Sequence, residues 1–141
     1  MSQSSDADQG LTWQLIYTKP RCEAWAEVNL RNQGFVVLGP RTRGRTSLVP
    51  LFPRYLFVGG QPAHPFERLR NTRGVAKVVY CGDYPARVEP DVIRQLRARM
   101  NANGVVTPDA PTRTGLFSGR ERERVRALLK LAAAGYRVRS A

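Results

Sequence analysis

Residues 50–58, PLFPRYLFV, constrain the fold of this chain more than any other stretch. The strand expected over 54–60 is almost entirely apolar, which is typical of a central strand covered on both faces. Proline cannot donate to a ladder and holds the preceding residue extended, so Phe52 is expected at the mouth of this strand. Alternation then predicts one face with Phe52, Arg54, Leu56 and Val58, and an opposite face with Tyr55 and Phe57. Because both faces are apolar, we expect one to meet helices and the other an external partner.

Strand and helix patterns alternate along the rest of the chain. Strands are predicted over 13–18, 35–40, 54–60 and 74–82, and helices over 21–33, 64–72 and 89–100. The basic segment RTRGRTS, 41–47, indicates an exposed hairpin or loop, and DYPARV, 83–88, indicates a turn. The order β-α-β-β-α-β-α predicts an α+β fold in which a four-stranded antiparallel sheet has helices packed against one face.

Composition divides the chain into four parts. They are a disordered polar leader, a folded domain, a linker rich in Gly, Pro, Asn and Thr, and a helical tail, over 1–11, 12–101, 102–119 and 120–141. The tail helix is predicted over 120–134, with an apolar stripe of Val125, Leu128, Leu129 and Ala132. After this helix, Tyr136 and Val138 alternate as in a strand.

The charge of the chain indicates a polyanionic partner. There are 23 basic residues against 11 acidic ones, a net charge of +12. Three of the 23 are lysines, so the other 20 are arginines, whose planar guanidinium groups bind phosphate through two hydrogen bonds and stack on bases. A GC-rich coding sequence would explain the ratio of arginine to lysine but not the net charge. Nucleic acid is therefore the expected partner.

Residue types that would support catalysis or metal binding are sparse. Cys22 and Cys81 lie far apart in the sequence, and His64 is the single histidine, so a zinc site is not expected. The carboxylates are scattered and neither cysteine has an activating motif, so neither an enzyme nor a cofactor is expected. The polar start of the sequence and the lack of a long apolar run predict a cytoplasmic protein without a membrane anchor.

Several motifs occur together in an order that resembles a known family. IYTKPR stands near the start, the basic segment 41–47 and LFPRYLFV follow, and NTRGVAKVVYCG comes next. Together they resemble the N-terminal domain of the NusG family of transcription elongation factors, over residues 12–101. The sequences PLFPRYLFV and TRGV resemble the specialised RfaH-like members more than housekeeping NusG. The resemblance implies the sandwich of sheet and helices found in that domain.

The resemblance implies two sets of site residues. A hydrophobic surface that docks on the clamp helices of the largest RNA polymerase subunit would contain Tyr17, Phe52, Tyr55 and Phe57. A basic surface toward the non-template DNA strand and the upstream DNA would contain Lys19, Arg21, Asn29, Asn32, Gln33, Arg41, Arg43, Arg45, Asn71, Thr72 and Arg73. Plainer interpretations remain open: the rings as core residues, the hairpin as a solvated loop, and Arg73 in a salt bridge that stabilises its turn.

The function implied is that of a factor, monomeric when free, that suppresses pausing and termination. The alternative from another class is a basic module that binds single-stranded nucleic acid or the ribosome. TGLFSG resembles the G-x-F-x-G of the family's C-terminal barrel, but the tail is too short to close five strands, which weakens any expected contact with a ribosomal protein or termination factor. Three interpretations of the tail stay open: a helix that covers the polymerase-binding face, an extra core helix, or the remnant of a barrel.

Overall fold

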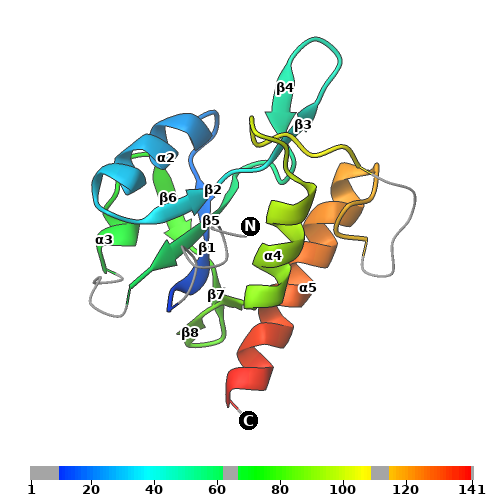
Figure 1. The fold of residues 1–141 in the computed structure, drawn as a ribbon. Coiled ribbons are helices and arrows are strands. Elements are labelled where there is room, and N and C mark those ends of the chain that lie inside the picture. The colour runs from blue at the N-terminus through cyan, green and yellow to red at the C-terminus, as the bar shows by residue number, and fades with distance from the viewer. Residues whose placement is uncertain (1–9, 62–66, 109–114, 141) are drawn as a thin grey trace.

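An antiparallel sheet forms the centre of the molecule. The computed structural model describes residues 10–61, 67–108 and 115–140, with the backbone alone for 134–140. The strands are β1 (Thr12–Thr18), β2 (Val36–Leu38), β3 (Arg41–Arg43), β4 (Leu48–Pro50), β5 (Tyr55–Gly60), β6 (Val75–Val78), β7 (Tyr80–Cys81), β8 (Tyr84–Pro85) and β9 (Arg87–Val88). The helices are α2 (Glu23–Asn32), α3 (Glu67–Arg70), α4 (Pro90–Arg99) and α5 (Glu121–Ser140) (Figure 1).

The main sheet has the order β2-β5-β1-β6, with the short β9 also paired to β1. The pairs are antiparallel, and the register places Leu15 opposite Phe57 and Tyr17 opposite Tyr55. Two hairpins, β3-β4 and β7-β8, form small sheets of their own, and β3-β4 projects away from the body of the protein (Figure 1). The α+β class, the antiparallel sheet and the C-terminal helix are as predicted.

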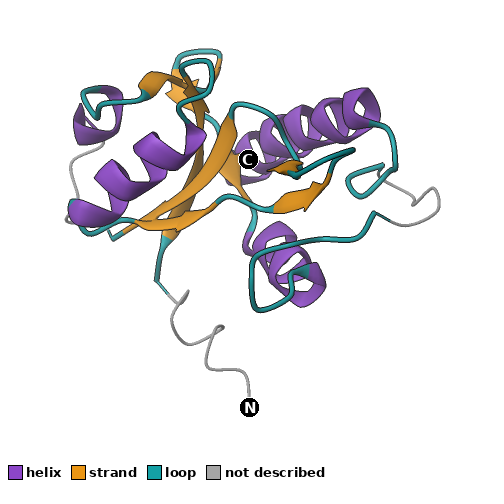
Figure 2. Cartoon of the chain, turned by 90° about the horizontal axis from the view of Figure 1, so that it is seen from above, coloured by secondary structure: helices purple, strands orange, loops and turns teal. Residues whose placement is uncertain are grey.

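Helices cover both faces of the main sheet, so the prediction of helices on one face is wrong (Figure 2). On one face, α2 and α3 pack over a set of residues that we call the α2-side cluster: Ile16, Ala26, Leu30, Phe35, Val37, Leu56, Val58, Leu69, Val75 and Val78. On the other, α4, α5 and the segment before α5 pack over the tail-side cluster: Trp13, Leu15, Leu38, Leu51, Phe52, Phe57, Val88, Val92, Ile93, Leu96, Val106, Leu116, Phe117, Ala127 and Leu128. Alternation along β1 and β5 sends their apolar side chains into both clusters.

Two local predictions differ from the structure. Residues 83–88 contain β8 and β9 as well as a turn, because the chain reverses at Gly82 and pairs again. Residues 136–138 are helical, since α5 continues without a break to Ser140. Tyr136 and Val138 alone cannot distinguish a strand from a helix, because apolar residues two positions apart occur in both.

The tail helix buries a face slightly different from the predicted stripe. Leu128 and Ala132 are buried as expected, but Leu129 is exposed and Arg124 is buried in its place. The division of the chain at 102–119 stays a prediction. In the described part of that segment, Leu116 and Phe117 are fully buried in the tail-side cluster. Three predictions lie in whole or in part outside the described residues. They concern the leader, the start of the helix predicted over 64–72, and His64.

Candidate functional site

Two tyrosines meet at the end of the central strand pair. Tyr17 on β1 and Tyr55 on β5 are register partners, and their ring centroids lie 5.0 Å apart. The guanidinium carbon of Arg54 lies 4.1 Å from the centroid of the Tyr17 ring, a cation–π distance. Both tyrosines are half-buried. Burial, and then the neighbouring phenol of Tyr17, raise the pKa of Tyr55, although Arg54 opposes this shift.

The turn before β5 has an unusual backbone. Arg54 has a φ of 71°, in the left-handed region that a residue with a Cβ adopts at a cost of roughly 1–3 kcal/mol. Its backbone N–H donates to the Glu23 carboxylate at 3.2 Å, and its Nε donates to the Thr18 carbonyl at 3.0 Å. These bonds hold the guanidinium over Tyr17. The strand therefore begins at Tyr55 and not at Arg54.

Phe52 and Phe57 lie on the same side of the sheet, so the alternation predicted across Pro53 is wrong. Their ring centroids are 5.7 Å apart in an edge-to-face contact, and both belong to the tail-side cluster. The turn at 52–54 breaks the extended register, which is why counting by twos fails there. Both rings are fully buried in the tail-side cluster, whereas Tyr17 and Tyr55 are only half-buried.

A buried arginine attaches the tail to this region. Arg124 of α5 donates from Nε to the Leu51 carbonyl at 2.9 Å and from Nη1 to the Ser118 carbonyl at 2.8 Å. Burial lowers the pKa of Arg124, and nearby Glu121 partly opposes that effect. Leu51 immediately precedes Phe52, so α5 bonds directly to the turn that carries the predicted aromatic surface. No pattern in the sequence predicts this contact, because an arginine in a charged helix is normally solvated.

A second group of predicted residues joins α2 to the turn that precedes β6. The side-chain amide of Asn29 donates to the Arg73 carbonyl at 3.1 Å. Gln33 donates to the Thr72 hydroxyl at 2.7 Å, and that hydroxyl donates to the Arg68 carbonyl at 2.6 Å. These three side chains therefore hold the turn against the helix, and Thr72 is buried.

Comparison with known proteins identifies the family. A sequence model of the family described as transcription termination factor nusG matches residues 11–97, more than half of the chain. The chain belongs to the NusG family. The match ends inside α4, so α5 and the segment before it lie outside the matched region. No curated protein matches the chain.

NusG proteins are transcription factors, and members of the family generally bind RNA polymerase.

Helix α2 and the turn before β6 that it holds both lie within the family match. The remaining predicted residues of that surface are exposed, and they are Lys19, Arg21, Asn32, Asn71 and Arg73. Arg21, like Arg54, has a positive φ of 61° and stands just before α2. The structure therefore brings the basic segment before α2 and the turn before β6 to one side of this helix, as Lys19 N–H bonds to the Gly74 carbonyl at 2.9 Å.

Sequence reasoning missed one aromatic side chain on α2, beside these exposed basic residues. Trp25 on α2 is 51% exposed, although tryptophan is usually well buried. Trp25, Val28 and Asn32 recur at helical spacing and share one exposed side of α2. Asn29, one turn after Trp25, bonds to the backbone of Arg73. Cys22, Ala26 and Leu30 lie four residues apart and predict a buried stripe on this helix, so a large apolar residue outside that stripe was the available signal.

The β3-β4 hairpin carries the other predicted basic residues. Arg41, Arg43 and Arg45 are exposed, and Leu48 and Val49 on β4 are exposed as well. Among the residues that the structure describes, no group of three or more His, Cys, Asp or Glu side chains could hold a metal ion. No helix within the described ranges is long and apolar enough to cross a membrane.

Proposed function

We propose that this NusG-family protein is a specialised elongation factor that binds the polymerase clamp helices and the non-template DNA strand and so suppresses pausing and termination. The observation that carries the proposal is the aromatic region at the end of β1 and β5. Tyr17 and Tyr55 form its half-buried part, and Phe52 and Phe57 continue it beneath the tail. A region of aromatic rings that is partly open to solvent is typical of a protein-binding surface.

The tail has a regulatory role in this proposal. Helix α5 lies outside the family match; its Ala127 and Leu128 belong to the same buried cluster as Phe52 and Phe57, and its Arg124 bonds to the carbonyl of Leu51, next to Phe52. A clamp helix could reach those two rings only if the elements that share their cluster, α5 among them, moved away. The free protein would thus hold its polymerase-binding surface partly closed, and polymerase would compete with α5 for it.

The exposed side of α2 supports the contact with DNA. Lys19, Arg21 and Arg73 supply positive charge there, and no carboxylate is bonded to their side chains among the described residues. Trp25 supplies an exposed ring on which an unpaired base can stack, an interaction of about 1–3 kcal/mol per base. Basic groups around an aromatic ring are the usual arrangement for binding a single strand.

The first experiment measures transcription directly. Run-on transcription with purified RNA polymerase, with and without the full chain, should show fewer paused and terminated products. Tyr17→Ala should weaken both this effect and co-purification with core polymerase. Tyr80→Ala removes a tyrosine that is 50% exposed elsewhere, so it serves as the matched control. If the protein binds nucleic acid but never co-purifies with polymerase, the alternative of a basic nucleic-acid-binding module is the better one.

The second experiment tests the DNA contact. Trp13 is buried and Trp25 is exposed, so quenching of fluorescence by a single-stranded oligonucleotide should come from Trp25. Trp25→Ala should lower the affinity roughly tenfold, in line with the loss of one stacked base. Val28→Ala, one turn along the same exposed side, should leave the affinity unchanged. Equal losses in the two variants would contradict a stacking role.

A further inference from the structure

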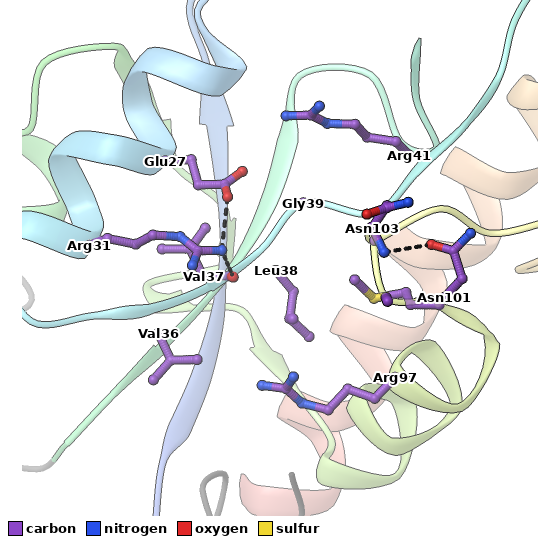
Figure 3. A pocket seen from close by; sticks show the side chains of 13 residues that line it. Glu27, Arg31, Val36, Val37, Leu38, Gly39, Arg41, Arg97, Asn101 and Asn103 are labelled. Atoms are coloured by element: carbon purple, nitrogen blue, oxygen red, sulfur yellow. Dashed lines mark hydrogen bonds and ion pairs between the residues drawn. The ribbon is translucent and has the colours of Figure 1, made fainter. Parts of the chain in front are cut away.

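A cleft lies between α2 with β2 and the end of α4 (Figure 3). Its volume is about 540 Å³. The edge strand β2 forms one wall, and the turn after α4 forms the opposite wall. The backbone joins that turn to the base of the β3-β4 hairpin, because Arg41 N–H donates to the Gly104 carbonyl and Val106 N–H donates to the Arg41 carbonyl. The cleft therefore opens directly beside the hairpin.

Three arginines and one carboxylate line this cleft. Arg31, Arg41 and Arg97 come from α2, β3 and α4, and Glu27 comes from α2 (Figure 3). Nη2 of Arg31 donates to Glu27 at 2.8 Å and to the Val37 carbonyl at 2.9 Å. Its Nη1 and Nε keep donors with no partner among the described residues. The charge of Glu27 is thus already paired, and the lining keeps a net positive charge.

Arg41 is the strongest sign of a ligand. Its guanidinium makes no hydrogen bond or ion pair within the part of the chain that the structure describes, although its backbone is fixed on both sides. Figure 3 shows Arg41 and Arg97 at opposite ends of the cleft, with Arg31 across from them. Guanidinium groups on separate elements around an open cleft match successive anionic groups better than one compact anion.

We propose that this cleft binds phosphates of a polynucleotide backbone, through Arg41, Arg97 and the free donors of Arg31. The inference extends the proposed DNA contact and rests on it. Arg41 begins the hairpin that carries the exposed Arg43 and Arg45, so the positive surface continues out of the cleft instead of ending within it. That continuity favours a strand over a free nucleotide. The half-buried side chain of Val36 on β2 gives a base or sugar an apolar surface to lie against.

The test measures the affinity of the full chain for a labelled oligo-dT strand by fluorescence anisotropy over a range of salt concentrations. Arg41→Gln with Arg97→Gln should lower the affinity at least about tenfold. Because each phosphate contact on a single strand contributes about 0.7 to the slope of log K against log salt, the double variant should lower that slope by about 1.4. Arg94→Gln is the matched single control, since Arg94 lies one turn before Arg97 on the same helix and is exposed. Arg31 is kept because its bonds join α2 to β2.

A second variant guards against an effect of folding alone. Asn103→Asp places a negative charge in the cleft lining at an exposed position, and it should also weaken binding. If the cleft variants lose no more affinity than Arg94→Gln, the cleft assignment is wrong while the proposed function stands. If dTMP binds the wild type and loses its binding in the double variant while oligo-dT does not, a free nucleotide is the ligand and the strand is excluded. If the wild type binds no oligonucleotide at all, the cleft assignment and the proposed DNA contact both fail, whereas polymerase binding is scored separately.

Discussion

Arg124→Met tests whether one buried guanidinium holds α5 against the sheet. Methionine keeps an apolar stem of similar length but removes the donors to the Leu51 and Ser118 carbonyls, at 2.9 and 2.8 Å. We expect α5 to detach more often while the sheet stays folded. The reason is that the two lost bonds cross between the helix and the segments beneath it, and neither lies within the sheet.

The size of the effect follows from these two bonds. Hydrogen bonds to a charged group contribute about 1.5–3 kcal/mol each. The lowered pKa of Arg124 shows that burial of its charge opposes part of this gain. A net loss of about 2–4 kcal/mol from the docked state is therefore expected. At about 1.4 kcal/mol per factor of ten, the detached population should rise roughly 30- to 700-fold.

Native-state hydrogen exchange measures this directly. Backbone amides over 121–133 should lose protection in Arg124→Met, while those of β1 and β5 should keep theirs. Arg126→Met changes an exposed arginine two residues later on the same helix and serves as the control. If the two variants exchange alike, the guanidinium does not hold the helix. If the helix and the sheet lose protection together, α5 does not detach on its own, and the proposed competition with polymerase fails. A rise in polymerase affinity in Arg124→Met would support that competition.

Three further predictions concern the fold around the candidate site. Gly74→Ala should cost at least about 2 kcal/mol of unfolding free energy, because φ is +95° and an added Cβ would lie 2.9 Å from the backbone of α2. Thermal unfolding measures this cost, and Gly82→Ala is the control because Gly82 has a φ of +65° with open space around it. The difference between the two variants separates the steric clash from the cost of the positive φ. Phe57→Ala should cost about 3–5 kcal/mol in urea unfolding, since the ring is fully buried, and a loss below about 1 kcal/mol would contradict its place in the core. Burial raises the pKa of Tyr55, so its contribution to stability is full below pH 10 and is lost as the pH rises through the raised value. Absorbance titration should therefore show that Tyr55→Phe removes a tyrosinate step above pH 10; removal of a step at or below it would refute this shift.

Much of the fold was predictable because its signals are local. The hairpin at 41–47, the helix over 90–99 and the central strand at 55–60 depend on residues that are neighbours in sequence, and the structure has all three. The site was less predictable. Strand alternation across Pro53 predicted Phe52 on the opposite face of the sheet from Phe57. The prediction is wrong because the positive φ of Arg54 interrupts the extended backbone between them. The exposed ring of Trp25 was not predictable, because helical spacing indicates which side chains are buried and does not indicate which exposed one binds a partner.

The sequence by itself determined the order of the main strands and helices, the basic character of the chain and its membership of the NusG family, since composition, periodicity and motif residues need no knowledge of distant contacts. Only the tertiary structure decided what covers the second face of the sheet. Burial of Arg124 against Leu51 joins residues that are 73 positions apart, and an amphipathic helix carries no record of the surface on which it packs. For the same reason, the cleft arginines come together from α2, β3 and α4 only once the chain has folded.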